Sequence, residues 1–155
     1  MNNFYKKGIT ALELLVALAV FGIIISIVIP QFSKMRENQV LKTGVADILS
    51  SIDKARSQTF SSLNSFEYGV HFQSDKVIIF KDINFSAVAS DNEEINITPP
   101  ASITNVTFGG QSGTSGDVYF NRLSGSPSTV GTITISTPSY SKIITISATG
   151  FASVN

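Results

Sequence analysis

A long apolar run near the N-terminus is the strongest pattern in this 155-residue chain. From Ile9 to Ile29, about 21 residues include a single charged residue, Glu13. As an α-helix these residues would span roughly 30 Å, the thickness of the hydrocarbon core of a bilayer. The run therefore predicts a membrane-crossing helix, with Lys6 and Lys7 just before it. A carboxylate inside such a helix is costly, so its retention suggests that Glu13 has a partner.

The helical pattern continues beyond Phe32, where apolar residues recur at a spacing close to 3.6. They are Leu41, Val45, Ile48, Leu49, Ile52, Ala55, Phe60 and Leu63. The opposite side of this helix carries charged residues, namely Lys42, Asp47, Asp53, Lys54 and Arg56. We therefore expect one long helix, with its first half in lipid and its second half packed against a globular head.

The pattern changes to alternation after Leu63. In residues 66–72 the apolar side chains Phe66, Tyr68, Val70 and Phe72 fall on one face, and residues 77–80 follow a turn, which predicts a hairpin. Further strands are expected at 94–98, 103–108, 117–121, 130–136 and 141–147, with Gly and Pro clusters between them. The predicted class is α+β, a long N-terminal helix packed on an antiparallel β-sheet. The head would comprise residues 32–155, with an amphipathic helix over 32–63 and a β-rich part over 64–155.

Composition narrows the function classes. The 11 basic and 11 acidic residues give a net charge of zero, which offers no overall attraction to nucleic acid. The chain has no cysteine, so a disulfide framework, thiol catalysis and cysteine-type zinc sites are excluded. The one histidine, His71, has no second histidine or cysteine with which to form a nucleophile–base pair or a transition-metal site. We therefore expect neither an enzyme nor a cofactor, and we expect His71 to be a solvated strand residue.

Two other segments of the head have simple interpretations. Asp91, Glu93 and Glu94 could offer oxygen ligands to calcium, but they lack the regular spacing of a calcium loop, so a solvated loop is expected. The glycine-rich segment 109–113 has no following lysine and no helix pattern. It predicts a flexible loop rather than a phosphate-binding loop.

Three interpretations of the apolar run compete. A cleaved secretory signal has a short apolar region and a small-x-small cleavage site, whereas this run is long and ends in IVIPQF. A plain membrane anchor would keep the N-terminus cytoplasmic through Lys6 and Lys7, but Lys34 and Arg36 after the run weaken that asymmetry. A plain anchor also leaves Glu13 without a role. The third interpretation takes these residues together.

The segment GITALELLVALAVFGIIISIVIPQF closely resembles the N-terminus of type IV pilins and type II secretion pseudopilins. The resemblance covers about the first 32 residues. The matching features are a basic leader ending at Gly8, the apolar Ile9, Glu13 at the fifth position after the leader, Gly22, and Pro30 followed by Gln31 and Phe32.

This resemblance implies that a membrane prepilin peptidase removes a leader of residues 1–8 by cleaving after Gly8, and that the new amine on Ile9 is methylated. Residues 9–31 would be the transmembrane and filament-core helix of a single-pass inner-membrane protein whose head lies outside the cytoplasm. In the filament, the Ile9 amine of one subunit would meet Glu13 of its neighbour, because a buried charge costs much less when it is paired.

The resemblance also gives a role to two helix-weakening residues. Pro30 lacks an N–H and kinks a helix, and Gly22 lowers helix stability relative to alanine. The implied consequence is that the segment between them loosens when subunits pack into a filament. The implied partners are the peptidase, other pilin or pseudopilin subunits, an inner-membrane assembly platform and membrane lipid.

Parts of the head are similar to minor pilins of the GspH/FimT type. The similar segments are the helix end at 55–58, the strand-turn sequence FNRLSGSP at 120–127, and the strand 143–147 before Gly150. A major pilin of the same architecture is the competing assignment.

The expected function is a structural pilin or pseudopilin subunit, and the alternatives are a DNA-binding minor pilin for DNA uptake and a plain membrane-anchored β domain. DNA binding would need a basic patch at the exposed end of the head. The tail after Gly150 has no Lys or Arg, and loss of the leader leaves 11 − 2 = 9 basic residues against 11 acidic ones. We therefore do not expect nucleic acid as a partner, although Lys142 and Arg122 could cluster in space.

Overall fold

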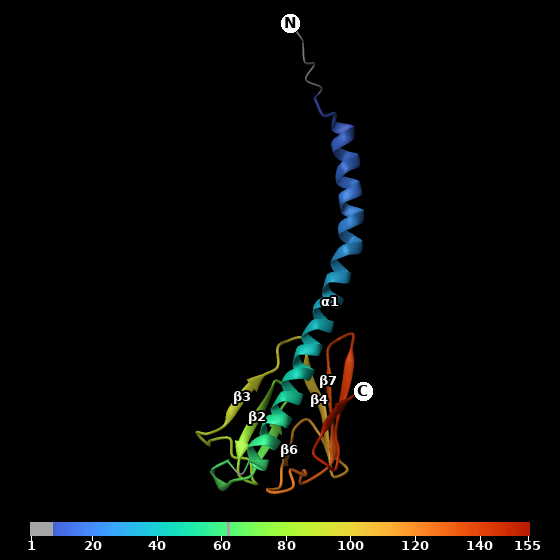
Figure 1. The fold of residues 1–155 in the computed structure, drawn as a ribbon. Helices are drawn as coiled ribbons and strands as arrows, with labels where there is room; N and C mark the ends of the chain where they lie inside the picture. The colour runs from blue at the N-terminus through green and yellow to red at the C-terminus, as the bar shows by residue number, and fades with distance from the viewer. Residues whose placement is uncertain (1–7, 62) are drawn as a thin grey trace. The chain divides into compact units, whose positions relative to one another are not determined.

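A computed structural model describes residues 8–61 and 63–155 of the chain. The chain divides after Arg36 into two compact units, and we call the second unit, Glu37–Asn155, the head. One helix, α1 (Ala11–Phe60), contributes to both units, and a short 3₁₀ turn, η1 (Leu63–Ser65), follows it (Figure 1). Nine strands occur in the described residues: β1 (Tyr68–Phe72), β2 (Lys76–Lys81), β3 (Glu93–Asn96), β4 (Ser102–Phe108), β5 (Gln111–Gly113), β6 (Gly116–Tyr119), β7 (Gly131–Ser136), β8 (Ser141–Ile146) and β9 (Ala152–Val154).

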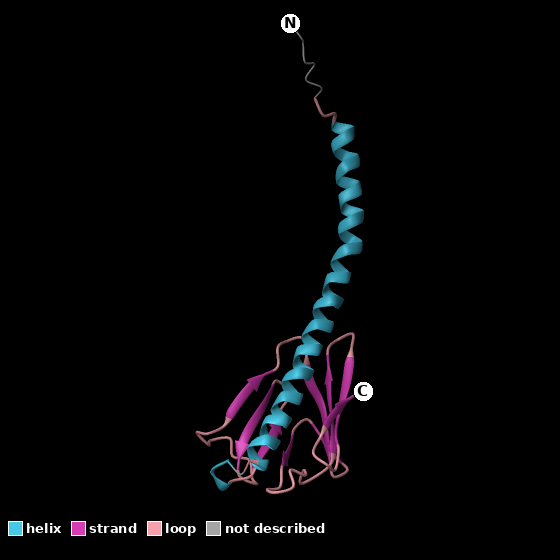
Figure 2. Ribbon diagram, in the orientation of Figure 1, coloured by secondary structure: helices cyan, strands magenta, loops and turns pink. Residues whose placement is uncertain are grey.

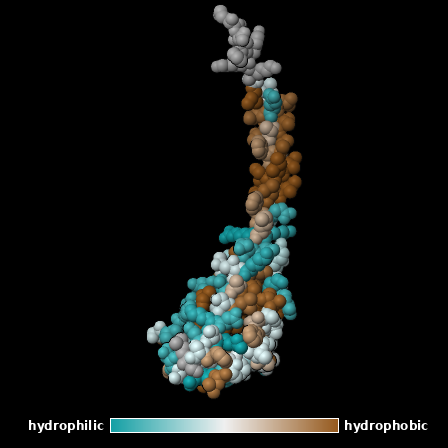
Figure 3. All heavy atoms as spheres, in the orientation of Figure 1, coloured by the Kyte–Doolittle hydropathy of each residue, from teal (hydrophilic) through white to brown (hydrophobic). Residues whose placement is uncertain are grey.

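In the first unit, α1 is apolar on every side. Its large aliphatic side chains from Leu12 to Ile29 are all exposed in the single chain, and Figure 3 shows a hydrophobic surface along this stretch. A helix that is apolar all round is stable only when lipid or protein covers it. By length and composition this helix could cross a membrane. The expected helix is therefore present, although it begins at Ala11 and not at Ile9.

In the head, α1 becomes amphipathic and packs against both sheets. Its buried positions recur every three or four residues, as expected for one helix face; they are Leu41, Gly44, Ile48, Ser51, Ile52, Ala55 and Thr59. Gly44 allows a close approach, because an added Cβ would lie 2.6 Å from Ile135 Cδ1. The expected place of Phe60 in the apolar face is wrong, since its side chain is 63% exposed at the last residue of the helix.

The strands form two antiparallel sheets and not the single sheet that we expected (Figure 2). Their strand orders are β3-β2-β1-β6 and β5-β4-β7-β8-β9. All seven expected strands are present, with no bound shifted by more than two residues. The prediction missed β5 and β9, and it wrongly made the segment 109–113 entirely a loop, because Gln111–Gly113 pairs with β4. Both missed strands have three residues, too few for alternation to be visible in the sequence.

The strands β1 and β2 are covered on both faces. Tyr68, Val70 and Phe72 face the common core, as their alternation predicted. Phe66 was expected on the same face, but it precedes β1 and is 42% exposed, with Lys81 Nζ 3.9 Å from the centre of its ring. On the opposite face, Phe85 of the β2–β3 loop (residues 82–92) packs on side chains of β1 and β2.

One hydrophobic core joins the helix to both sheets. It contains Ile48 and Ile52 of α1, Val70 of the first sheet, and Ile133 and Ile144 of the second sheet, all fully buried. The head is therefore a single α+β unit, which confirms the predicted class.

Candidate assembly site

The expected cleavage site lies just before the helix. Gly8, Ile9 and Thr10 are not helical, and the side chain of Ile9 is 80% exposed. An exposed segment without secondary structure is what a peptidase can engage. Lys6 and Lys7, the basic part of the expected leader, lie outside the described residues.

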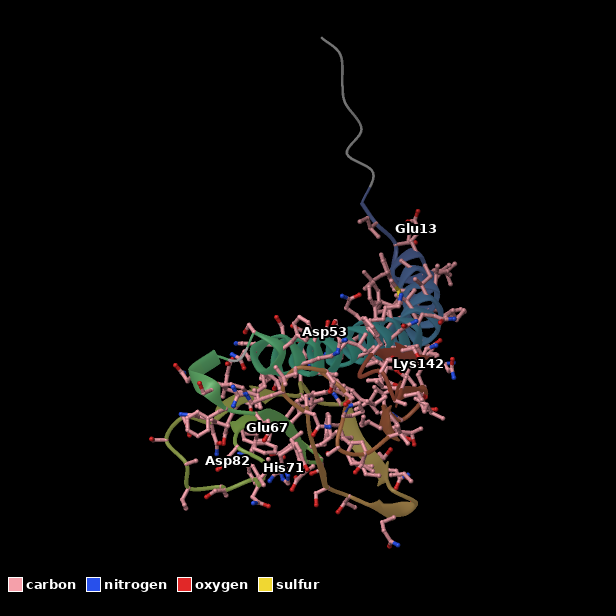
Figure 4. All side chains as sticks on the ribbon, turned by 60° about the horizontal axis from the view of Figure 1, so that its bottom comes forward. Glu13, Asp53, Glu67, His71, Asp82 and Lys142 are labelled. Atoms are coloured by element: carbon pink, nitrogen blue, oxygen red, sulfur yellow. The ribbon has the colours of Figure 1, made fainter. Side chains whose placement is uncertain are left out.

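Glu13 and Thr10 form a capping box at the start of α1. The Glu13 N–H donates to Thr10 Oγ1 (3.2 Å), while Glu13 Oε2 accepts from the Thr10 N–H (3.1 Å) and from the Thr10 hydroxyl (3.2 Å). Such a reciprocal pair satisfies N–H groups that a helix start otherwise leaves without partners. The carboxylate therefore has a local partner, and it is held at the N-terminal end of the helix (Figure 4). Thr10 was not among the residues predicted to form the site, although a Thr-x-x-Glu spacing before an apolar run is a recognised signal of a capping box.

Gly22 and Pro30 lie along the same helix, roughly 14 Å and 26 Å beyond Glu13 at 1.5 Å per residue. The three residues are therefore in a row and are not gathered into one site. The helix is continuous through Pro30, whose missing N–H leaves the Ser26 carbonyl without its usual donor. The Ser26 hydroxyl donates to the Ile23 carbonyl at 2.8 Å. Pro30 thus removes one backbone hydrogen bond from α1, and Gly22 lowers the intrinsic stability of the helix earlier in the same stretch.

His71 is not the solvated residue that we expected. Its side chain is only 11% exposed, because the ring of Phe85 in the β2–β3 loop stacks on it at 3.9 Å between centroids and an interplanar angle of 4°. Nδ1 of His71 contacts Asp117 Oδ1, and Nε2 lies 3.0 Å from Gln73 Nε2. This long-range cover could not be read from strand alternation. The Phe85 stacking holds the loop on the sheet, while Asp117 and Gln73 hold the imidazole ring of His71 from within the sheet.

The acidic residues near β3 are paired individually with lysines. The pairs are Lys54–Glu93 at 2.6 Å, Lys76–Glu94 at 3.0 Å and Lys81–Asp91 at 4.0 Å. Glu93 and Glu94 also begin β3, so the expected solvated loop is correct only for Asp91. Within residues 8–61 and 63–155, no group of three or more His, Cys, Asp or Glu side chains could hold a metal ion.

Arg56 of α1 joins two loops of the head, one at Gly125 and one at Gly150 and Phe151. Its Nε donates to the Gly125 carbonyl at 3.1 Å, and its guanidinium carbon lies 4.2 Å from the centre of the Phe151 ring. Gly150 adjoins this contact with a φ of +84°, and an added Cβ would lie 2.8 Å from Arg56 Nε. Phe60 and Phe151 border a cavity of about 430 Å³ beside the guanidinium.

The two cations that could have formed a basic patch lie in different surroundings. Arg122 donates from Nη1 to the Ser65 carbonyl at 3.0 Å, whereas Lys142 lies with Lys42 at a separate hollow between α1 and β8.

Comparisons with protein-family models, curated proteins and solved structures found no match.

Proposed function

We propose that this chain is a structural subunit, a pilin or pseudopilin, of a type IV pilus or a type II secretion pseudopilus. In this proposal it is anchored in the inner membrane with its head outside the cytoplasm, cleaved after Gly8 and methylated on Ile9. The observation that carries the proposal is a helix that is apolar on every side and has one carboxylate, Glu13, fixed in its first turn.

The exposed apolar surface of α1 must be shielded from water in every state of the protein. Lipid covers it before assembly, and neighbouring helices would replace the lipid in a filament. The resemblance of the first 32 residues to pilins and pseudopilins supports this second state. Pro30 and Gly22 suit such repacking, because proline removes one backbone hydrogen bond of the helix and glycine lowers helix stability.

The position of Glu13 suits pairing with an amine. Cleavage after Gly8 creates a cation on Ile9, one residue before the capping Thr10. The capping box engages Oε2 of Glu13 and leaves Oε1 without a hydrogen bond among the described residues. When subunits stack, Oε1 can accept from the Ile9 amine of the next subunit, which removes an unpaired cation and an unpaired anion from the same dry core.

Intact-mass analysis of the protein from native membranes tests the proposal. The expected mass corresponds to loss of residues 1–8 and gain of one methyl group. The same cells without the prepilin peptidase are the control, and they should contain the full-length chain. Finding the Met1 terminus while the peptidase is active would contradict the proposal.

A further inference from the structure

We propose that the head docks onto a second copy of itself, with the β2–β3 loop of one copy seated in a hollow on the other. This inference rests on the proposed function, since it names one contact between the heads of adjacent subunits. The hollow lies between α1 and the strands β8 and β9 and has a volume of about 210 Å³. Its lining residues are Asn38, Leu41, Lys42, Val45, Lys142 and Val154.

The hollow combines an apolar floor with a basic rim. Leu41 is buried, while Val45 and Val154 are half-buried and open to it. Lys42 and Lys142 are exposed at the rim, and neither has an ion-pair partner in the described part of the chain. Such a site suits an aliphatic side chain that is flanked by carboxylates.

The β2–β3 loop presents that chemistry. Val88 is 93% exposed and Ile83 is 43% exposed, which makes the loop tip aliphatic. Asp82 and Asp91 flank this part of the loop, and Asp91 forms a long ion pair with Lys81 at 4.0 Å. The tip and its two flanking acids therefore match the floor and the two rim lysines of the hollow in polarity and in charge.

The loop is also ordered before it meets a partner. Phe85 stacks on His71, and the side-chain amide of Asn92 donates to the Ser86 carbonyl at 2.8 Å. These contacts hold the loop on its sheet-facing side and leave Val88 exposed to solvent. A preordered loop loses little conformational entropy on binding.

The loop and the hollow lie at opposite ends of the head. Figure 4 places Asp82 at one end and Lys142 at the other. Figure 1 agrees, because the β2–β3 loop follows the lower end of β2, whereas β8 (Ser141–Ile146), which includes Lys142, starts at the upper end of the head. A contact between two different surfaces of identical subunits forms a ring if its rotation closes and an open helical array if it does not, so it is compatible with a filament.

Disulfide cross-linking of the full chain in cells tests this contact, since the natural chain has no cysteine. The test variant carries Val88→Cys and Asn38→Cys, both at exposed positions. With a mild oxidant, we expect a ladder of covalent multimers in the sheared filament fraction. The single variants, and Val88→Cys combined with Thr114→Cys in the exposed turn after β5, should give no ladder.

The outcomes separate the two proposals. Filaments that form without a ladder of disulfide-linked multimers through positions 88 and 38 would overturn the head contact and leave the proposed function standing. A dimer linked through position 88 of both copies as the main product, or a disulfide to a different protein, would overturn the head contact as well. Absence of both filaments and ladder would count against both proposals.

Charge reversal adds an independent test in the same cross-linking strain. Replacing Lys42 and Lys142 by Glu should lower the ladder yield several-fold, because the rim would then repel Asp82 and Asp91. Adding Asp91→Lys should recover part of that loss. An unchanged yield after reversal of both lysines would overturn the charge match.

Discussion

The Thr10 hydroxyl and the Glu13 carboxylate hold each other at the first turn of α1, with the Thr10 hydroxyl 3.2 Å from Glu13 Oε2 and from the Glu13 backbone nitrogen. Glu13 therefore has two separable roles, one as a helix cap and one as a charge. The cap acts within a single chain. The proposed charge pair acts only when a second subunit brings its Ile9 amine.

Glu13→Gln and Thr10→Val separate these roles. Gln can complete a capping box but carries no charge, whereas valine at position 10 removes the cap and keeps the carboxylate. We expect Glu13→Gln to insert and be cleaved but to form few filaments, because an unpaired buried cation costs about 3–5 kcal/mol. Thr10→Val should lose only about 1 kcal/mol of helix stability and keep most of its filament yield.

The measurement is the yield of sheared filaments at equal membrane levels of each variant. Glu13→Ala, which loses cap and charge together, should behave like Glu13→Gln. Normal incorporation of both Glu13 variants would refute the pairing role. A Thr10→Val defect as severe as that of Glu13→Gln would make capping, and not charge, the main role of Glu13.

The head should fold without the apolar helix. Glu37–Asn155 is one compact unit whose core is complete within itself, since every buried side chain of α1 lies at or beyond Leu41. We expect this fragment to be soluble and monomeric, with helix and strand signals in circular dichroism and a single cooperative unfolding transition. Aggregation of the fragment, and of a longer one that starts near residue 32, would show that the core needs the apolar half of α1.

Gly150→Ala should destabilise the head more than Gly110→Ala. Their φ angles are nearly equal, at +84° and +82°, so both substitutions strain the backbone similarly. Only at position 150 would the new Cβ meet Arg56 Nε at 2.8 Å and the Gly125 carbonyl, while position 110 is open. Urea unfolding of the head should give a difference of about 1–3 kcal/mol, the usual cost of overpacking. Equal losses would mean that Arg56 moves aside freely.

Thr59→Val tests a buried polar contact between the helix and β1. Thr59 is fully buried, and its hydroxyl accepts from the Tyr68 N–H at 2.8 Å. Valine fits the space but leaves that donor without a partner, so the free energy of unfolding should fall by about 1–3 kcal/mol. The control is Thr43→Val, at an exposed site where the hydroxyl bonds only to the Gln39 carbonyl. The control should change stability by less than about 0.5 kcal/mol, and an equal effect at both sites would contradict the assigned role of Thr59.

The elements with local signals can be predicted from the sequence alone. The length and polarity of Ile9–Ile29 predict an apolar helix, the 3.6-residue spacing carries it into the head, and alternation finds seven of the nine strands in the described residues. These patterns arise from neighbours within one element, so they can be read without knowing the fold. The Thr10–Glu13 capping box also belongs to this class, because its partners are three residues apart.

Features that depend on contacts between distant segments are set by the tertiary structure. It divided the strands into two sheets, covered His71 with Phe85, and brought Arg56 to Gly125, 69 residues away in the sequence. It also exposed Phe60, because Thr59, four residues after Ala55, takes the buried position at the helix end and turns Phe60 outward. Sequence periodicity does not predict such pairs. Each pair depends on the conformation of the loops between the elements and on which faces of the helix and the sheets pack together in the core.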